Sequence, residues 1–192
     1  MKLLKRTLCT ILMISVVLSL SACSASKLSH EKFCKFFNSQ DLDECEDYND
    51  YTDIYGKLTK EVGGYITLKD KKAQKIYEKL FNRTNMYPDY DVTQATSAYV
   101  ADKDGYSFVF MFTLEDAKDA EKLFKKFSKN LEDDGEEKGL QYAYTYTEKS
   151  SKRDVLKAVY LNKNTVLIIQ ANTKDMDFVQ DLCEEFKLPC DF

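Results

Sequence analysis

The chain has 192 residues, a net charge of −4, an apolar fraction of 44%, 13 tyrosines and 12 phenylalanines. This apolar and aromatic content excludes a disordered or low-complexity chain, and the acidic balance argues against a nucleic-acid partner, whose phosphates require a basic surface. The length beyond the first apolar run is enough for one domain with a hydrophobic core, and short for two.

The N-terminus has the features of a signal peptide. A positive segment containing Lys2, Lys5 and Arg6 precedes an apolar stretch at residues 8–20, which is too short for a lasting transmembrane helix. Small residues follow this stretch. The sequence Leu20-Ser21-Ala22-Cys23 resembles the lipobox of bacterial lipoproteins, in which an aliphatic residue and two small residues precede the lipidated cysteine.

The lipobox resemblance implies cleavage before Cys23, diacylation of the Cys23 thiol and anchoring on the outer, extracytoplasmic face of the cell membrane. Two acyl chains hold a protein on a membrane far better than one. Cleavage also removes three positive charges and no negative ones, so the net charge falls from −4 to −7. The expected segments are a signal peptide at 1–22, a lipidated cysteine with a short linker at 23–28, and a single domain at 29–192 with a helical part at 29–95 and a sheet part at 96–192.

The first half of the domain has the 3.6-residue period of amphipathic helices. Ser29 is a suitable N-cap, Gly63-Gly64 is a suitable helix stop, and Thr67 with Asp70 resembles a capping box. Three helices are therefore expected, the first from Ser29, the second over 41–62 and the third after Thr67. Residues 82–95 form the expected loop between the two halves.

The second half changes from a period of 3.6 residues to a period of 2. Residues 97–112 predict a hairpin around an Asp-Lys-Asp-Gly turn, and its second strand is apolar on both faces, which is typical of a central strand. The other expected elements are strands at 140–147, 155–161 and 165–171 and helices from Thr113 and about Asp175. The predicted fold class is α+β: a five-stranded, mainly antiparallel sheet with helices packed on one face (β-β-α-β-β-β-α), preceded by about three N-terminal helices.

Two segments of the second half resemble each other weakly. Residues 98–127 and 158–186 both have the pattern of a hairpin followed by a capped helix. The similarity has two explanations. It is an internal repeat, or it arises because any β-β-α unit needs a turn, a helix cap and an apolar helix face at these spacings. A true repeat would place the two helices side by side on one face of the sheet.

Four cysteines remain in the domain once Cys23 is set aside: Cys34, Cys45, Cys183 and Cys190. An extracytoplasmic location permits disulfides, and the sequence leaves three pairings open, as well as free thiols. We favour bonds between the N-terminal and C-terminal helices, because Leu188-Pro189 makes a local bond within the second pair awkward. A metal site is not expected, since neither close pair has the short gap of a zinc motif.

The residues needed for most catalytic chemistry are missing. The mature chain has one histidine, His30, which we expect to be exposed next to the linker, and this excludes catalytic triads and histidine-based zinc sites. No glycine-rich phosphate loop is present, so no catalytic residue and no cofactor are expected. Acidic groups at 41–53 and 132–137 are interpreted as solvated, with weak cation binding as the alternative for the first group.

Tyr142, Tyr144 and Tyr146 alternate along one predicted strand and therefore point to one face. We expect that face to belong to the core, with the alternating alanine and threonines on the outside. The alternative is an exposed aromatic platform that binds a protein or a sugar.

These features together predict a membrane-anchored lipoprotein whose domain is a non-catalytic binding or protein-interaction module. Its expected partners are the membrane, through the lipid on Cys23, and a protein of the cell surface or envelope. The alternative is an accessory lipoprotein that binds a small molecule or a cation, and a hydrolase is the third hypothesis. The ligand itself is not specified by the sequence.

Overall fold

The computed structural model describes residues 28–47, 62–81, 90–148 and 153–190. Its strands are β1 (Asp43–Glu44), β2 (Val62–Lys69), β3 (Val92–Asp102), β4 (Gly105–Leu114), β5 (Asp133–Glu137), β6 (Leu140–Thr147), β7 (Asp154–Asn162) and β8 (Thr165–Thr173). Its helices are α2 (His30–Ser39), α4 (Asp70–Phe81), α5 (Ala117–Ser128) and α6 (Asp177–Phe186). None of these described helices is long and apolar enough to cross a membrane.

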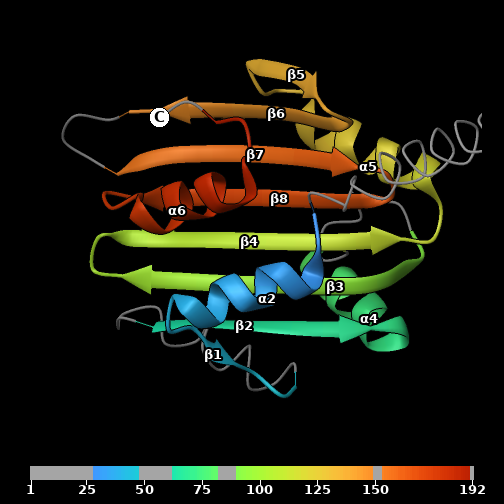
Figure 1. The fold of residues 1–192 in the computed structure, drawn as a ribbon, viewed down its shortest axis with the longest axis horizontal. Coiled ribbons are helices and arrows are strands. Elements are labelled where there is room, and N and C mark those ends of the chain that lie inside the picture. Colours follow the sequence, from blue (N-terminus) through green and yellow to red (C-terminus); the bar gives the residue numbers. More distant parts are fainter. Residues whose placement is uncertain (1–27, 48–61, 82–89, 149–152, 191–192) are drawn as a thin grey trace, which may run out of the picture.

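The strands form one eight-stranded mixed sheet in the order β1-β2-β3-β4-β8-β7-β6-β5 (Figure 1). The β1–β2 pair is parallel, and the other pairs are antiparallel. The β3–β4 and β7–β8 hairpins lie at its centre, so strands that are adjacent in sequence form each half of the sheet. This order confirms the predicted hairpin at 97–112 and the central position of its second strand.

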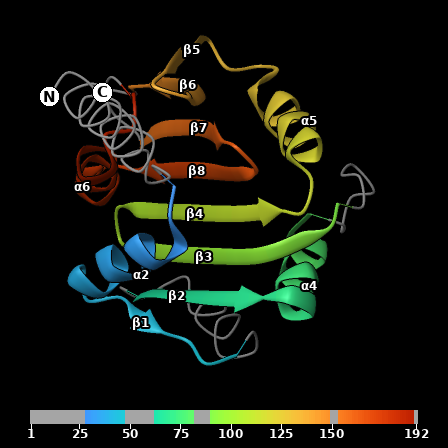
Figure 2. The same cartoon turned by 45° about the vertical axis from the view of Figure 1, so that its right-hand side comes forward.

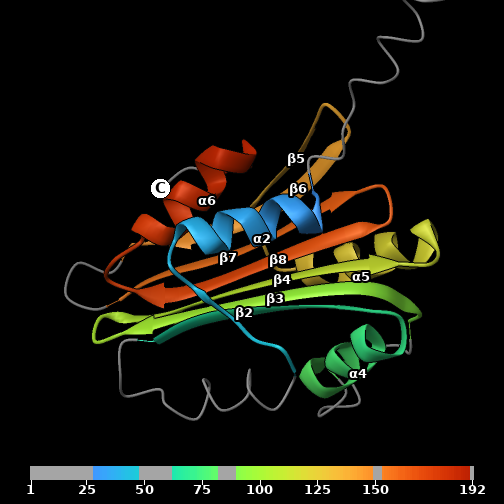
Figure 3. The ribbon, with the colours of Figure 1, turned by 60° about the horizontal axis from the view of Figure 1, so that its bottom comes forward.

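Helices cover both faces of the sheet. The α4 and α5 helices lie away from α2 and α6 (Figure 2), and Figure 3 shows α2 and α6 on one side of the strands and α4 on the other, where α5 shares its core. Each side has its own apolar core. In β4, Val109 and Met111 join the core on the α2–α6 side, whereas Phe110 and Phe112 join the core on the α4–α5 side. The alternation of side chains along a strand thus supplies both cores from one segment.

The prediction of a five-stranded sheet with helices on one face is wrong. Strands β1, β2 and β5 extend the sheet where the sequence pattern indicated helix or turn. Gly63 lies within β2, where a Cβ would collide with the side chain of Leu42, so this glycine allows close packing in the strand. The predicted helix over 41–62 is interrupted by β1, and residues 48–61 lie outside the described part of the chain.

Two of the predicted helix caps are also corrected. Thr67 lies within β2, and its hydroxyl bonds Thr96 across the sheet. Thr113 lies within β4, and the cap of α5 is Asp116, whose carboxylate accepts a hydrogen bond from the backbone of Lys118 at 2.7 Å. A hydroxyl that binds a neighbouring strand is not available to cap a helix.

The predicted consequence of an internal repeat is not observed. α5 and α6 lie on opposite faces of the sheet and not side by side on one face. Because β4 and β8 are antiparallel neighbours, a twofold axis between them would keep both following helices on the same face. The weak similarity is therefore explained by the shared needs of strand, turn and helix.

Candidate functional site

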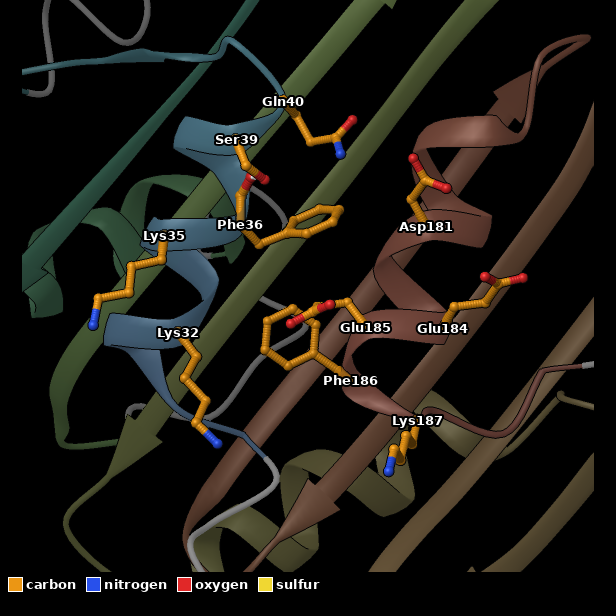
Figure 4. A pocket seen from close by; sticks show the side chains of 10 residues that line it. All are labelled: Lys32, Lys35, Phe36, Ser39, Gln40, Asp181, Glu184, Glu185, Phe186 and Lys187. Carbon is orange, nitrogen blue, oxygen red and sulfur yellow. Dashed lines mark hydrogen bonds between the residues drawn. The ribbon is translucent and has the colours of Figure 1, made fainter.

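A groove opens between α2 and α6 on one face of the sheet (Figure 4). The two helices run in opposite directions there, so that Lys32 lies at the same end as Lys187, and Gln40 lies at the same end as Asp181. The volume of this α2–α6 groove is about 880 Å³. Its lining residues are Lys32, Lys35, Phe36, Ser39 and Gln40 from the α2 side and Asp181, Glu184, Glu185, Phe186 and Lys187 from the α6 side.

Phenylalanine side chains hold the two helices beside each other. The ring of Phe33 stacks on Phe186 with centroids 3.9 Å apart, and Phe36 meets Phe186 edge-on at 5.9 Å. Phe36 also contacts Phe178 at the start of α6, at 5.9 Å. Such aromatic pairs contribute about 0.5–1.5 kcal/mol beyond the area that they bury, so the walls of the groove are fixed by their own packing.

The two walls of the groove carry opposite net charge, with two lysines on the α2 side against three carboxylates and Lys187 on the α6 side. Lys32 and Lys35 project from α2, while Asp181, Glu184 and Glu185 project from α6, and all five are exposed. Among the described residues, none of the ion pairs joins the two walls. The amine of Lys35 instead pairs with Glu31 on its own helix, at 2.8 Å, and this neighbour lowers the pKa of the Glu31 carboxyl. Most of the charge on the walls therefore faces solvent.

His30 is buried beneath the first turn of α2, so its expected exposure is wrong. The Nδ1 atom lies 2.7 Å from the Thr96 hydroxyl of β3, and Nε2 lies 2.9 Å from the Thr113 hydroxyl of β4. These hydroxyls in turn bond Thr67 of β2 at 2.7 Å and Thr165 of β8 at 2.9 Å. One imidazole thus joins a row of hydroxyls across four neighbouring strands and ties α2 to the sheet.

Burial keeps the His30 ring neutral. Desolvation, with a smaller contribution from the charge of Lys69, lowers the pKa of His30 to about 4. In the neutral ring one nitrogen donates and the other accepts a hydrogen bond, and a threonine hydroxyl can serve either nitrogen. Since both nitrogens are occupied inside the fold, this arrangement is suited to holding a helix.

The four cysteines of the domain fall into three places, and no disulfide joins any of them. Cys34 lies beside the Thr67 and Thr96 hydroxyls, and burial raises its pKa. Cys45 packs against the opposite face of the sheet, on the α4–α5 side. Cys183 and Cys190 are within hydrogen-bonding reach of each other at the end of α6. The structure therefore separates the N-terminal cysteines from the C-terminal ones, contrary to the pairing that we favoured.

The three tyrosines of β6 face the α2–α6 side of the sheet. Tyr144 is 7% exposed, whereas Tyr142 and Tyr146 are half-buried at the margin of the core. The ring of Tyr142 covers Gly135 on the neighbouring strand β5, where a Cβ would lie 2.6 Å from the tyrosine hydroxyl. Ala143, on the other face, is buried against the α4–α5 core and not exposed as expected.

Neither acidic group forms a metal-binding cluster among the described residues. In the first group, Asp43 and Glu44 form the exposed edge strand β1, Glu46 and Asp47 are exposed after it, and the residues beyond position 47 lie outside the described part. In the second group, the residues from Asp133 to Glu137 form the edge strand β5, whose carboxylates are exposed. Charged side chains on edge strands discourage pairing with other chains.

Cys23 lies outside the described residues, but its distance from the domain is limited by the chain. His30 is the seventh residue after Cys23, and an extended chain spans at most about 3.6 Å per residue, so the two lie within about 25 Å. Comparison with protein-family models, with curated proteins and with solved structures finds no match to this chain.

The α2–α6 groove and the His30 contacts are the features that sequence reasoning missed. The partners of His30 are 66 and 83 residues away along the chain, so no local pattern signals them. For the groove a signal exists: α2 has lysines beside its phenylalanines, and α6 has a run of carboxylates before Phe186. The lysines and the carboxylates form one groove only because α2 and α6 lie on the same face of the sheet, which the sequence does not show.

Proposed function

We propose that this protein is a lipoprotein anchored through Cys23 on the outer face of the cell membrane, and that its domain binds a segment of another envelope protein without catalysing a reaction. The anchor is supported by the lipobox resemblance. The binding role is supported by the α2–α6 groove, whose walls carry opposite charges above an aromatic floor.

A polypeptide is the ligand class that suits this groove best. Its floor is formed by Phe36 and Phe186, and aromatic side chains are enriched in the cores of protein interfaces. A lysine wall and a carboxylate wall together match a segment that presents both charges, and they fix its direction. An envelope partner also has access, because α2 begins within about 25 Å of the anchored cysteine.

Site-specific cross-linking on intact cells tests the proposal. A photoreactive residue at Gln40, which lines the groove, should give a discrete protein adduct, whereas the same residue at the exposed Lys125 of α5 should not. Lys125 is a suitable control because α5 lies on the opposite face of the sheet. Equal adducts at the two positions would contradict binding in the groove.

Charge reversal then identifies the walls as the binding surface. Lys32→Glu and Glu185→Lys should each lower the yield of the Gln40 adduct by up to about fivefold, as the loss of about 1 kcal/mol of charge attraction implies. The matched controls, Lys118→Glu and Glu121→Lys, make the same charge changes on exposed positions of α5 and should leave the yield unchanged. If each control lowers the yield as much as its matched groove variant, the charges of the groove walls do not determine the adduct.

A further inference from the structure

Two thiols meet at the C-terminal end of α6. Cys183, in the last turns of the helix, is 5% exposed, and Cys190 is half-buried against the same core. The two thiols are within hydrogen-bonding reach of each other, and the Tyr160 hydroxyl of β7 interacts with both. None of these three residues lines the α2–α6 groove itself, although Cys183 directly precedes the carboxylates of its α6 wall.

The backbone after α6 is shaped to bring these thiols together. Lys187 adopts a left-handed conformation with φ of 51°, which reverses the chain immediately after the helix. The backbone N–H of Leu188 then donates to the Cys183 carbonyl at 2.8 Å, which is the bonding pattern of a Schellman turn. The Tyr160 hydroxyl donates to the Pro189 carbonyl at 3.1 Å and fixes the returning segment on β7.

The other two cysteines cannot take part in this arrangement. Cys34 lies beside the threonines of β2 and β3, and Cys183 lies beside Tyr160 of β7. In the sheet order, β4 and β8 stand between β3 and β7, so even these two strands lie about 14 Å apart at the usual spacing of about 4.8 Å. A disulfide requires Cα atoms within about 7 Å. Cys45 packs on the opposite face of the sheet.

We infer that Cys183 and Cys190 form a redox-active pair, which closes to a local disulfide in an oxidising compartment. The inference rests on the proposed extracytoplasmic location only for its oxidising surroundings, and it does not depend on what the groove binds. Disulfides persist outside the cytoplasm and are rare within it. The closed loop, residues 183–190, would contain Phe186 and Lys187, which line the α2–α6 groove.

The bond forms by exchange with an external disulfide, either a small one such as oxidised glutathione or that of a thiol oxidoreductase. The Cys190 thiol loses its proton to water, and its thiolate attacks one sulfur of the oxidant, releasing the first external thiolate. Cys183 then loses its proton, attacks the Cys190 sulfur and releases the second thiolate. One protein disulfide forms while one external disulfide is reduced to two thiols.

Burial determines the order of these steps. The hydrogen bond with the Cys190 thiol and desolvation by burial raise the pKa of Cys183, which disfavours its thiolate. Cys190 is the more exposed of the two and is therefore the first to react with an external disulfide. Cys183 follows only when the mixed disulfide at Cys190 places an electrophilic sulfur beside it.

Peptide mapping without reduction tests the pairing in the full chain taken from membranes with free thiols blocked. Trypsin cuts after Lys174 and after Lys187, inside the proposed loop. The expected product is therefore peptide 175–187 joined to peptide 188–192, and reduction should separate the two. A link from peptide 175–187 to peptide 33–35, which carries Cys34, would overturn the inference.

Equilibration of the full chain in mild detergent with glutathione buffers separates the inference from the proposed location. The 175–187 to 188–192 product should appear as the oxidised fraction rises, disappear completely in Cys190→Ser, and remain in the control Cys34→Ser. If Cys183 and Cys190 are recovered as unpaired, chemically blocked thiols at every ratio of oxidised to reduced glutathione, the inference is overturned. A bond that forms in these buffers but is absent from cells supports the pair and contradicts the extracytoplasmic location.

Discussion

The His30 imidazole and the Thr96 hydroxyl, 66 residues apart in the sequence, lie 2.7 Å from each other between α2 and β3. This contact places a titratable ring in the interface between the helix and the sheet. Lys69 is the charged group that acts on it most strongly, and Thr113 occupies its other nitrogen. Two of the following predictions depend on this interface.

Stability should depend on pH through His30. The pKa of His30 is lowered from 6.5 to about 4 in the fold, so the unfolded chain binds an additional proton between these values. The free energy of unfolding should be unaffected by His30 above pH 6.5 and fall by about 3 kcal/mol as the pH drops towards 4. Urea unfolding of the wild type and of His30→Gln, compared across this range, isolates the effect from the carboxylates. A difference between the two proteins that is constant with pH would contradict it.

Thr96→Val should destabilise the fold by about 1–3 kcal/mol, because it leaves the buried Nδ1 of His30 without its hydroxyl partner. It also removes the Thr67 contact at 2.7 Å. The control is Thr147→Val on β6, an exposed position with the same change of side chain, where an effect within about 0.5 kcal/mol is expected. The measurement is the midpoint of urea unfolding, provided that the slope of the free energy of unfolding against urea concentration is unchanged. Equal losses of stability in Thr96→Val and Thr147→Val would contradict a stabilising role for the threonine hydroxyls that contact His30.

Tyr144→Ala should cost about 3 kcal/mol of stability, because the ring is buried in the core beneath the α2–α6 side. Tyr142→Ala should cost less, since Tyr142 is only half-buried. Thermal unfolding of both variants ranks them. If Tyr144→Ala keeps its stability and loses a binding partner, the strand acts as an aromatic platform instead.

Cys23→Ala should transfer the protein from the membrane fraction to the soluble fraction almost completely, because no acyl chain can then be attached. Cys34→Ala, which removes a thiol inside the domain, should leave the protein in the membrane fraction. Fractionation of intact cells followed by immunoblotting provides the measurement. An unchanged membrane pool in Cys23→Ala would show that the lipobox does not anchor this protein.

The elements that could be predicted from the sequence are those whose pattern is local. The side chains of Phe108, Phe110 and Phe112 alternate with apolar neighbours, and this alternation correctly indicated a central strand. The apolar residues of α5 and α6 likewise recur at helical spacing, and in the structure these residues form the buried face of each helix. Burial of one face imposes such a period regardless of what the rest of the chain does.

The elements that could not be predicted depend on distant pairing. Tyr65 and Ile66 fit a helical stripe or a strand equally well, and their pairing with Ala98 and Ser97 of β3 decides for the strand. The hydroxyl of Thr113 has the chemistry of a helix cap, but Thr165 and His30 bind it instead. Similarly, the left-handed Lys187 has no glycine to signal it, so the approach of Cys190 to Cys183 was not apparent.

The position of α2 has a mechanical consequence. It is the first described element after Cys23 and also one wall of the groove, so in the proposed anchored complex a pull between the membrane and a bound partner would pass through this helix. The load is shared by the stacked ring of Phe33 and by the two hydroxyl contacts of His30. Tension that strips α2 from the sheet would open the groove and release the partner while leaving the protein attached to the membrane.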